Sequence, residues 1–192
     1  MKRLIFLIAP LLFSLTACAH STDGHTAVTS APTASKSSAM TYAVPASCTQ
    51  TSILATISPL IKGATVINSR WEPAAGTELA DFLDNGGIAC SYGNAQAEIG
   101  TTIKWVSDAD LLFTKREVDW ARVKYAKVVI PGKDVTAAYF LFKPVGPTQE
   151  FQIWALNILI GGTWIQINTS YLHDLEGATS LIDAAINSAL IK

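Results

Sequence analysis

The apolar stretch 151–167 restricts the possible folds of this chain more than any other segment, because it is long enough to be mistaken for a membrane span. It contains three amide side chains, however, and Gly161-Gly162 lies near its centre. A glycine pair between two apolar runs is typical of a tight β-hairpin, since both residues can adopt positive φ. We therefore predict two buried strands, 150–160 and 163–169.

A second hairpin is expected earlier in the chain, from strands 88–92 and 98–106. Ile103 and Trp105 fall on one face of the later strand, and Thr102 and Lys104 fall on the other. This alternation predicts a sheet with one buried face. Shorter strands are expected at 64–71, 127–130 and 135–143.

Helical spacing of apolar residues predicts an N-terminal helix at 53–61, a short helix at 77–84, a central helix at 107–125 and a C-terminal helix capped by Asp174 or Thr179. Hairpin-linked strands combined with such helices indicate an α+β domain with a largely antiparallel sheet.

The two longer helices have different patterns. Ser107-x-x-Asp110 is a candidate capping box for the central helix. Its expected apolar stripe consists of Leu111, Val118, Ala121 and Tyr125. The C-terminal helix shows a cleaner stripe, formed by Leu181, Ile182, Ala185, Ile186, Ala189 and Leu190.

The first residues carry an export signal: Met1-Lys2-Arg3, a short apolar run, and Leu15-Thr16-Ala17-Cys18. The last four resemble the lipobox of bacterial lipoproteins. That resemblance implies cleavage after residue 17, attachment of a diacylglyceryl group (and palmitate) to Cys18, and anchoring at the extracytoplasmic face of the cell membrane. A simple cleaved signal with a chance cysteine is the alternative. A transmembrane anchor is disfavoured, because the run is short and Pro10 interrupts it.

Residues 18–47 form the expected tether, and residues 48–192 form a single globular domain. The tether is rich in Ser, Thr and Ala and poor in large aliphatic residues, so it cannot bury enough apolar surface to offset ordering. As a flexible coil it would reach roughly 30 Å. Without Lys2 and Arg3 the chain keeps 12 basic and 15 acidic residues, which argues against nucleic acid as a partner.

The three cysteines are Cys18, Cys48 and Cys90. If Cys18 is lipidated, the other two remain as a pair outside the cytoplasm, where thiols tend to oxidise. We therefore predict a Cys48–Cys90 disulfide. Two thiols alone do not make a structural zinc site, and we expect neither a metal nor a cofactor.

A search for catalytic patterns finds no nucleophile elbow, zinc-protease motif, P-loop or dinucleotide fingerprint. His173, followed by Asp174 and Glu176, could serve as a general base, although a loop position with Asp174 as a helix cap explains the same pattern. The aromatic Trp164 and Tyr171 are candidate ligand-binding residues together with His173. For Trp164, a core position in its strand is the simpler interpretation.

Several of these features occur together in one family. A lipobox, a Ser/Thr/Ala tether, Cys48, the stretch 87–92, the strand 161–167 and a C-terminal amphipathic helix resemble small secreted actinobacterial lipoproteins of the LpqN type. The resemblance implies a PsbP-like α/β/α sandwich and a role in binding or interaction, and it supplies no catalytic residues.

Our leading hypothesis is therefore a membrane-anchored binding or interaction domain, whose partner is an unidentified envelope protein or small molecule. Two alternatives stay open. One is a carrier of lipid or another apolar molecule, which needs an apolar cavity. The other is a hydrolase that uses His173, which needs a pocket and a nucleophile beside it.

Overall fold

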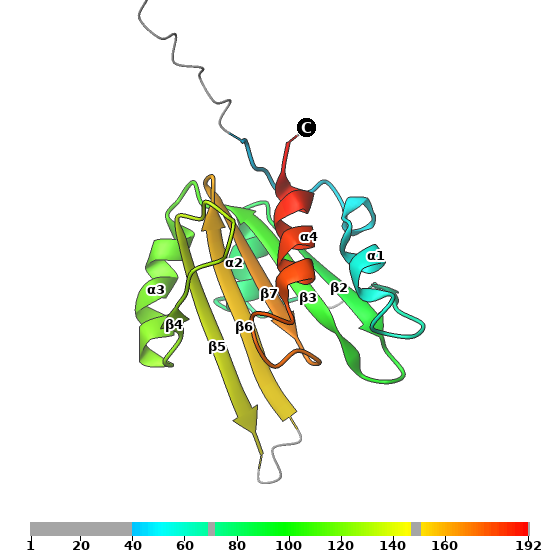
Figure 1. Cartoon of the computed structure of the whole chain (residues 1–192). Coiled ribbons are helices and arrows are strands. Elements are labelled where there is room, and N and C mark those ends of the chain that lie inside the picture. Colours follow the sequence, from blue (N-terminus) through cyan, green and yellow to red (C-terminus); the bar gives the residue numbers. More distant parts are fainter. Residues whose placement is uncertain (1–39, 69–71, 147–150, 192) are drawn as a thin grey trace, which may run out of the picture. The chain divides into compact units, whose positions relative to one another are not determined.

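The computed structural model describes residues 40–68, 72–146 and 151–191 (Figure 1). Within them the predicted α+β class is confirmed: a mixed set of helices accompanies a largely antiparallel sheet. In chain order the elements are η1 (Cys48–Gln50), α1 (Ile53–Ile57), β1 (Thr65–Ile67), α2 (Glu78–Asp84), β2 (Ile88–Asn94), β3 (Ile99–Ser107), α3 (Leu112–Arg122), β4 (Ala126–Lys127), β5 (Ala137–Val145), β6 (Phe151–Ile160), β7 (Thr163–Thr169) and α4 (Thr179–Ala189).

The strands described form one seven-stranded sheet in the order β1-β2-β3-β7-β6-β5-β4, and every neighbouring pair is antiparallel. Both predicted hairpins, β2–β3 and β6–β7, are present. They meet in the middle of the sheet, where β3 pairs with β7 from Thr101↔Thr169 to Ser107↔Thr163. This central pairing joins segments about sixty residues apart in the chain.

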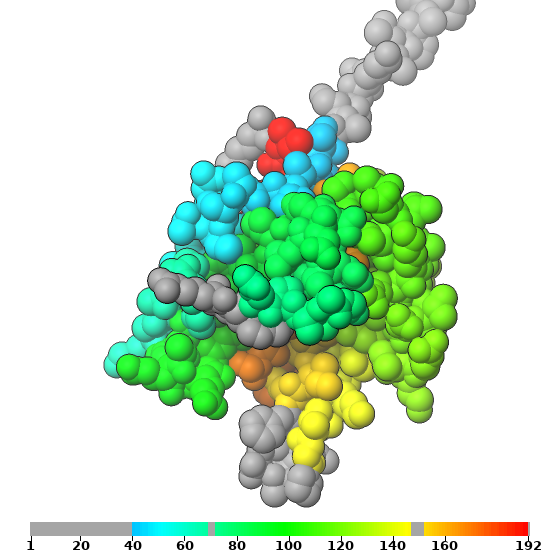
Figure 2. All heavy atoms as spheres, turned by 180° about the vertical axis from the view of Figure 1, so that it is seen from behind, coloured from blue at the N-terminus to red at the C-terminus, as the bar shows by residue number. Residues whose placement is uncertain are grey.

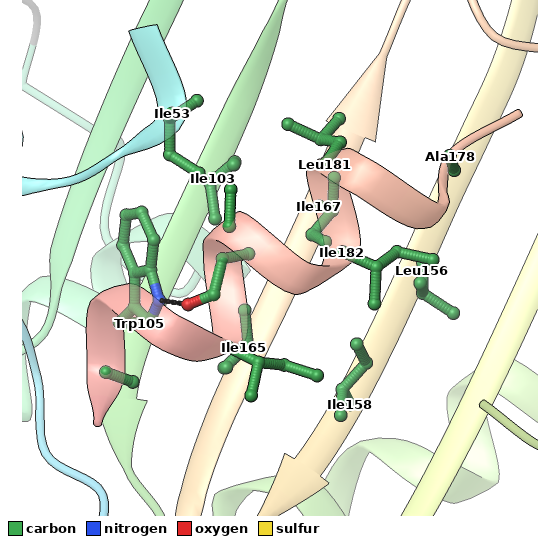
Figure 3. Packing of buried hydrophobic residues seen from close by; sticks show 14 of the residues in the cluster. Ile53, Ile103, Trp105, Leu156, Ile158, Ile165, Ile167, Ala178, Leu181 and Ile182 are labelled. Atoms are coloured by element: carbon green, nitrogen blue, oxygen red, sulfur yellow. Dashed lines mark hydrogen bonds between the residues drawn. The ribbon is translucent and has the colours of Figure 1, made fainter. Parts of the chain in front are cut away.

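Helices cover both faces of the sheet, so the prediction of one buried face is wrong. On the first face, α1 and α4 pack on alternate residues of the central strands, including Ile103, Ile165 and Ile167 (Figure 3). The Trp105 indole lies in this layer and donates a 3.0 Å hydrogen bond to the carbonyl oxygen of Ala185 in α4. The predicted apolar stripe of α4 is buried there, with Leu190 at its end only partly covered.

On the opposite face, α2 and α3 pack on the intervening strand residues. Phe82 of α2 and Phe113 and Trp120 of α3 surround the buried Trp164 of β7, with ring centroids 4.2 to 5.9 Å from its own. The expected stripe of the central helix is therefore wrong. Val118 is 66% exposed, because Phe113 and Trp120, two turns apart, face the sheet in place of the aliphatic residues.

The ends of three helices have identifiable chemistry. Asn85-Gly86-Gly87 ends α2 as predicted, and Gly86 has φ +74°. The Ser107 capping box is wrong: the Asp108 carboxylate accepts a 2.8 Å hydrogen bond from the Phe113 amide, so α3 starts later than expected. Neither predicted cap holds for α4, whose N-cap is Ala178; Asp174 instead accepts from the Gly177 amide at 2.8 Å.

The β6–β7 turn has the geometry expected of its glycine pair. Gly161 and Gly162 have φ values of +53° and +74°, as a tight hairpin requires. The Tyr42 ring lies so close to Gly161 that a Cβ added there would be 2.4 Å from a ring carbon.

Tyr42 belongs to a segment that extends the domain beyond the predicted boundary at residue 48. It forms an antiparallel bridge with Leu190. Two backbone hydrogen bonds flank this bridge, from Ala43 to Ala189 at 2.7 Å and from Ile191 to Thr41 at 2.9 Å. The end of the expected tether is thus paired with the C-terminal segment. Residues 1–39, which include Cys18, lie outside the described residues.

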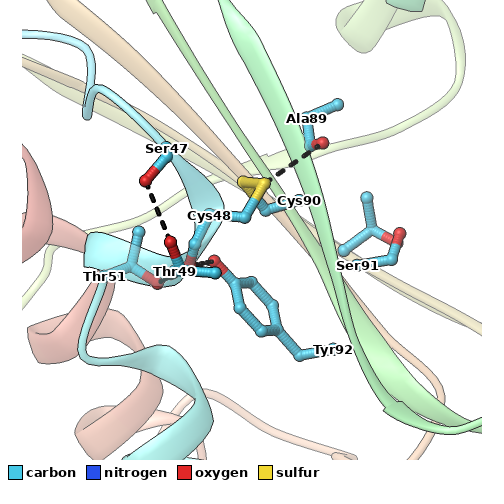
Figure 4. Close-up of a disulfide and its surroundings, with 9 residues drawn as sticks. Ser47, Cys48, Thr49, Thr51, Ala89, Cys90, Ser91 and Tyr92 are labelled. Carbon is cyan, nitrogen blue, oxygen red and sulfur yellow. Dashed lines mark hydrogen bonds between the residues drawn. A yellow bond between two sulfur atoms is a disulfide. The ribbon is translucent and has the colours of Figure 1, made fainter. Parts of the chain in front are cut away.

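The Cys48–Cys90 disulfide is confirmed (Figure 4). Its Cα atoms lie 5.4 Å apart. The neighbouring Tyr92 hydroxyl donates to the carbonyl oxygen of Cys48 at 2.9 Å and lies 2.7 Å from Oγ1 of Thr51. The disulfide and these hydrogen bonds together attach η1 to β2.

Candidate functional site

Three polar side chains stand in one row across the sheet face that α2 and α3 cover. The register pairs Lys104 of β3 with Gln166 of β7, and Gln166 with Asn157 of β6. Their exposed fractions are only 8%, 3% and 0%. Because buried polar groups cost free energy unless they are hydrogen-bonded, these side chains need hydrogen-bond partners.

Glu78, the first residue of α2, is the hydrogen-bond partner of two of them. Its Oε1 atom accepts a 3.1 Å hydrogen bond from Nζ of Lys104 and a 2.7 Å hydrogen bond from Nε2 of Gln166. The helix begins at this point because the Thr77 side chain caps it, accepting from the Ala80 amide. The carboxylate thus neutralises the buried ammonium group and also lies at the positive end of the α2 dipole.

Asn157 completes the network from the other end of the row. Its Oδ1 atom accepts from Nε1 of Trp164 at 3.0 Å and from Nε2 of Gln166 at 2.9 Å. Its Nδ2 atom is buried and has no hydrogen-bond partner among the described residues.

The direction of every hydrogen bond in this network is determined by two groups. An indole N–H can only donate, which orients the Asn157 amide, and a carboxylate can only accept, which orients Gln166. Oε1 of Gln166 must then accept from Nδ2 of Asn168, at 3.2 Å. Among the described residues nothing donates to Oδ1 of Asn168, so this side-chain oxygen is available as an acceptor.

Tyr125 lies next to this network, and the end of α3 places it there. Lys124 adopts φ +69°, and the Tyr125 amide donates to the Trp120 carbonyl at 3.0 Å, as in a Schellman motif. Burial, together with the negative charge of Glu78, raises the pKa of Tyr125 to about 12, and the Asn157 amide offsets part of that rise. The Tyr125 hydroxyl therefore remains protonated at neutral pH.

The next row of the same face forms the floor of a groove. Oγ of Ser91 lies 3.0 Å from Oγ1 of Thr102, and Thr102 pairs with Asn168 across the β3–β7 ladder. One row further, Gly93 pairs with Gly100. Because neither glycine has a side chain, the sheet face is bare at that point. We call the surface formed by Ser91, Thr102, Asn168 and the Gly93–Gly100 pair the polar groove.

The polar groove is open to solvent and has a volume of about 520 Å³. Ile67 of β1 and Ile153 of β6 also line it, and Ile153 is 43% exposed. Figure 2 shows this face: β7 (orange) is visible between the β2–β3 hairpin and β6 (yellow-orange), below α2. The groove thus combines a hydrogen-bonding floor with apolar sides.

The structure does not bring the three predicted ligand-binding residues together. Trp164 is fully buried beneath α2 and α3. Tyr171 packs against the opposite core, where burial raises the pKa of its hydroxyl. His173 is exposed, and its ring meets the edge of Phe142 with centroids 6.0 Å apart. Within the described ranges, His173 forms no hydrogen bond or ion pair with a neighbouring side chain.

Sequence reasoning misses the buried polar row for an identifiable reason. Asn157 and Gln166 read only as polar interruptions of an apolar stretch, and the alternation along β3 assigns Lys104 to a solvent-facing side. The signal that could have revealed the row is an amide or a lysine within a strand of which both faces are buried. Recognising it requires knowing that α2 covers this face of the sheet.

Comparisons with protein-family models, curated proteins and solved structures found no match. Among the described residues, no group of three His, Cys, Asp or Glu side chains could hold a metal ion. No helix in the described part of the chain is long and apolar enough to cross a bilayer.

Proposed function

We propose that this protein is a lipid-anchored, extracytoplasmic bacterial protein whose α+β domain binds a ligand in the polar groove. The lipobox-like sequence ending at Cys18 supports the location, as does the disulfide, since such bonds persist in oxidising compartments. The resemblance to small actinobacterial lipoproteins with a PsbP-like sandwich remains part of this proposal.

One observation carries the binding role: an open groove is floored by side chains that a buried network holds in place. Asn168 presents its side-chain oxygen Oδ1, which has no donor among the described residues, because Gln166 and Glu78 fix the orientation of the Asn168 amide. Thr102 and Ser91 add hydroxyl groups that can donate or accept. Preorganised polar groups inside an otherwise apolar concavity are typical of ligand sites.

The polar floor supports this proposal over the two alternatives. A lipid chain in the groove would cover Ser91, Thr102 and Asn168 without replacing the hydrogen bonds that these residues make with water, which is unfavourable. The hydrolase hypothesis draws no support from the exposed His173.

Membrane anchoring is tested with a Cys18→Ala variant. We expect the wild-type protein to sediment with membranes after cell breakage, and the variant to move to the soluble fraction. Wild-type protein that is already soluble without detergent would contradict lipid anchoring.

Groove binding is tested by native mass spectrometry of the full chain isolated from its own envelope. We expect the wild-type protein to retain an additional mass. Thr102→Phe, which fills the groove, should lose that mass, and Thr114→Phe on the exposed side of α3 should keep it. Circular dichroism confirms that both variants fold. If the wild type retains nothing, or Thr102→Phe retains the mass, the groove is not a binding site.

A further inference from the structure

A second surface lies at the β4–β5 edge of the sheet, away from the polar groove. β4 pairs with only two residues of β5, Tyr139 and Phe140. The following residues of β5, 141–145, have no strand beside them on that side within the described ranges (Figure 1). The C-terminal end of α3 lies next to this free edge.

Basic side chains gather there. A hollow of about 490 Å³ is lined by Arg122, Val123, Lys124, Leu141, Phe142 and Lys143. Lys127 of β4 is also exposed on this edge. We call Arg122, Lys124, Lys127 and Lys143 the basic edge. Four of the nine Lys and Arg residues in the described ranges therefore belong to one side of the domain.

Two acidic residues of α3 face this region. Asp119 forms ion pairs with Arg122 at 3.3 Å and with Arg116 at 3.5 Å. Glu117 lies beside the hydroxyl of Tyr139, whose pKa is raised by burial and by that carboxylate. Neither carboxylate is paired with Lys124, Lys127 or Lys143. The basic edge therefore keeps a positive excess.

Exposed apolar side chains lie among these cations. Val123 is 55% exposed, and Phe142 and Val145 are each 37% exposed. Positive charges interspersed with apolar side chains match the interfacial region of a bilayer, where anionic headgroups border the hydrocarbon.

The backbone of the same edge disfavours a partner that adds a strand. The Val128 amide donates to the Ala138 carbonyl at 3.0 Å, so every second residue from Ala138 directs its backbone groups outward. Pro144 occupies one of these outward positions and has no amide hydrogen to offer. Proline on an edge strand is a common protection against strand pairing. The side chains, rather than the backbone, must therefore make the contact.

We propose that the basic edge is a membrane-contact surface that lies on anionic lipid headgroups, in addition to the lipid on Cys18. This contact would hold the domain in one orientation on the bilayer. The lipid expected on Cys18 would hold the chain at the membrane but would leave the domain free to turn, whereas a basic surface in contact with anionic headgroups fixes one orientation. The proposal concerns orientation and does not depend on what the polar groove binds.

The test places an environment-sensitive dye at the basic edge and at a distant control site. Full-length protein carrying Val145→Cys or Ala55→Cys, the latter on the exposed side of α1, is labelled without reduction of the disulfide. Each is mixed with phosphatidylcholine vesicles containing a nitroxide-labelled lipid, with or without phosphatidylglycerol. We expect quenching at residue 145, stronger with phosphatidylglycerol and weakened by salt, and little quenching at residue 55.

Charge reversal provides the matched comparison. Lys124→Glu combined with Lys143→Glu should lower the phosphatidylglycerol-dependent quenching at residue 145 by at least about tenfold, because four units of charge change at the surface. Lys62→Glu combined with Lys115→Glu changes the net charge by the same amount outside the basic edge, and it should leave the quenching at residue 145 unaltered. Equal quenching at residues 145 and 55, or no effect of the first pair, would overturn the proposal. The proposal would also be overturned if the fluorescence of the dye at residue 145 changed on addition of soluble polyglutamate but not on addition of vesicles. That result would indicate an acidic protein partner instead.

Discussion

The indole nitrogen of Trp164 donates to the side-chain oxygen of Asn157 at 3.0 Å, across the β6–β7 hairpin. This hydrogen bond connects the aromatic cluster beneath α3 to the polar row beneath α2. Because Asn157 also accepts from Gln166, its single oxygen satisfies two buried donors. The orientation of the groove floor therefore depends on a residue that does not line the groove.

Replacing Asn157 by leucine should destabilise the protein by about 3 kcal/mol, because the donors of Trp164 and Gln166 would be left buried without an acceptor. The free energy of unfolding, measured with urea, tests this. Asn187→Leu makes the same chemical change at an exposed position of α4 and should cost little. Equal stability of the two variants would contradict the importance of the network.

Loss of the Cys48–Cys90 disulfide should destabilise the domain strongly. The two cysteines are 42 residues apart in sequence, and closing a loop of that size corresponds to about 4 kcal/mol in the chain-entropy model, which is an upper-end value. Unfolding of the wild type with and without reductant, beside a Cys48→Ala/Cys90→Ala variant, measures the difference. If reductant does not shift the unfolding midpoint, the prediction is wrong.

Alanine substitutions at Gly161 and Gly162 separate the effect of losing the Tyr42 contact from the effect of backbone strain. Both glycines have positive φ, but only a Cβ at Gly161 would meet the Tyr42 ring. Alanine at either position should cost about 1 kcal/mol from strain. Only Gly161→Ala should also release residues 41–43 from their pairing with residues 189–191.

Hydrogen exchange at the Ala43 and Ile191 amides, which are hydrogen-bonded in this pairing, reports that release. Faster exchange in Gly161→Ala than in Gly162→Ala is the expected result. Identical exchange in the two variants would mean that Tyr42 does not hold the segment in place.

Local chemistry explains which parts of the fold were predictable. The β6–β7 hairpin depends on Gly161-Gly162, and the disulfide follows from the number of cysteines and the expected compartment. By contrast, the buried side of α3 is chosen by partners that are distant in sequence. Phe113 and Trp120 face inward because Trp164 and Phe82 form an aromatic cluster there. Their i, i+7 spacing places them on one side of α3, but only those distant partners make that side the buried one.

The candidate site shows the same limit. Alternation along β3 correctly placed Lys104 and Trp105 on opposite faces, but it could not show that both faces are covered. Lys104 is tolerated in the interior because Glu78, 26 residues earlier, neutralises it. Such pairing over a distance in sequence is set by the topology and not by a local pattern.

The pH dependence of stability should contain a contribution from Tyr125. Its pKa is raised from 10.0 in the unfolded chain to about 12 in the fold, mainly by burial and then by the charge of Glu78. Between these values the folded chain binds more protons than the unfolded chain. The contribution is therefore fully present below pH 10 and is lost as the pH rises toward 12.

Tyr125→Phe keeps the ring and removes the hydroxyl group, so it should flatten the fall in unfolding free energy over this range. Tyr92 and Tyr171 also have raised pKa values because of burial, and they should account for part of the fall that remains. Urea unfolding at a series of pH values, together with titration of tyrosinate absorbance, measures both effects. If the variant loses stability as steeply as the wild type, and the same number of tyrosines titrates late in both proteins, then Tyr125 is not shielded by the network around Glu78 and Asn157.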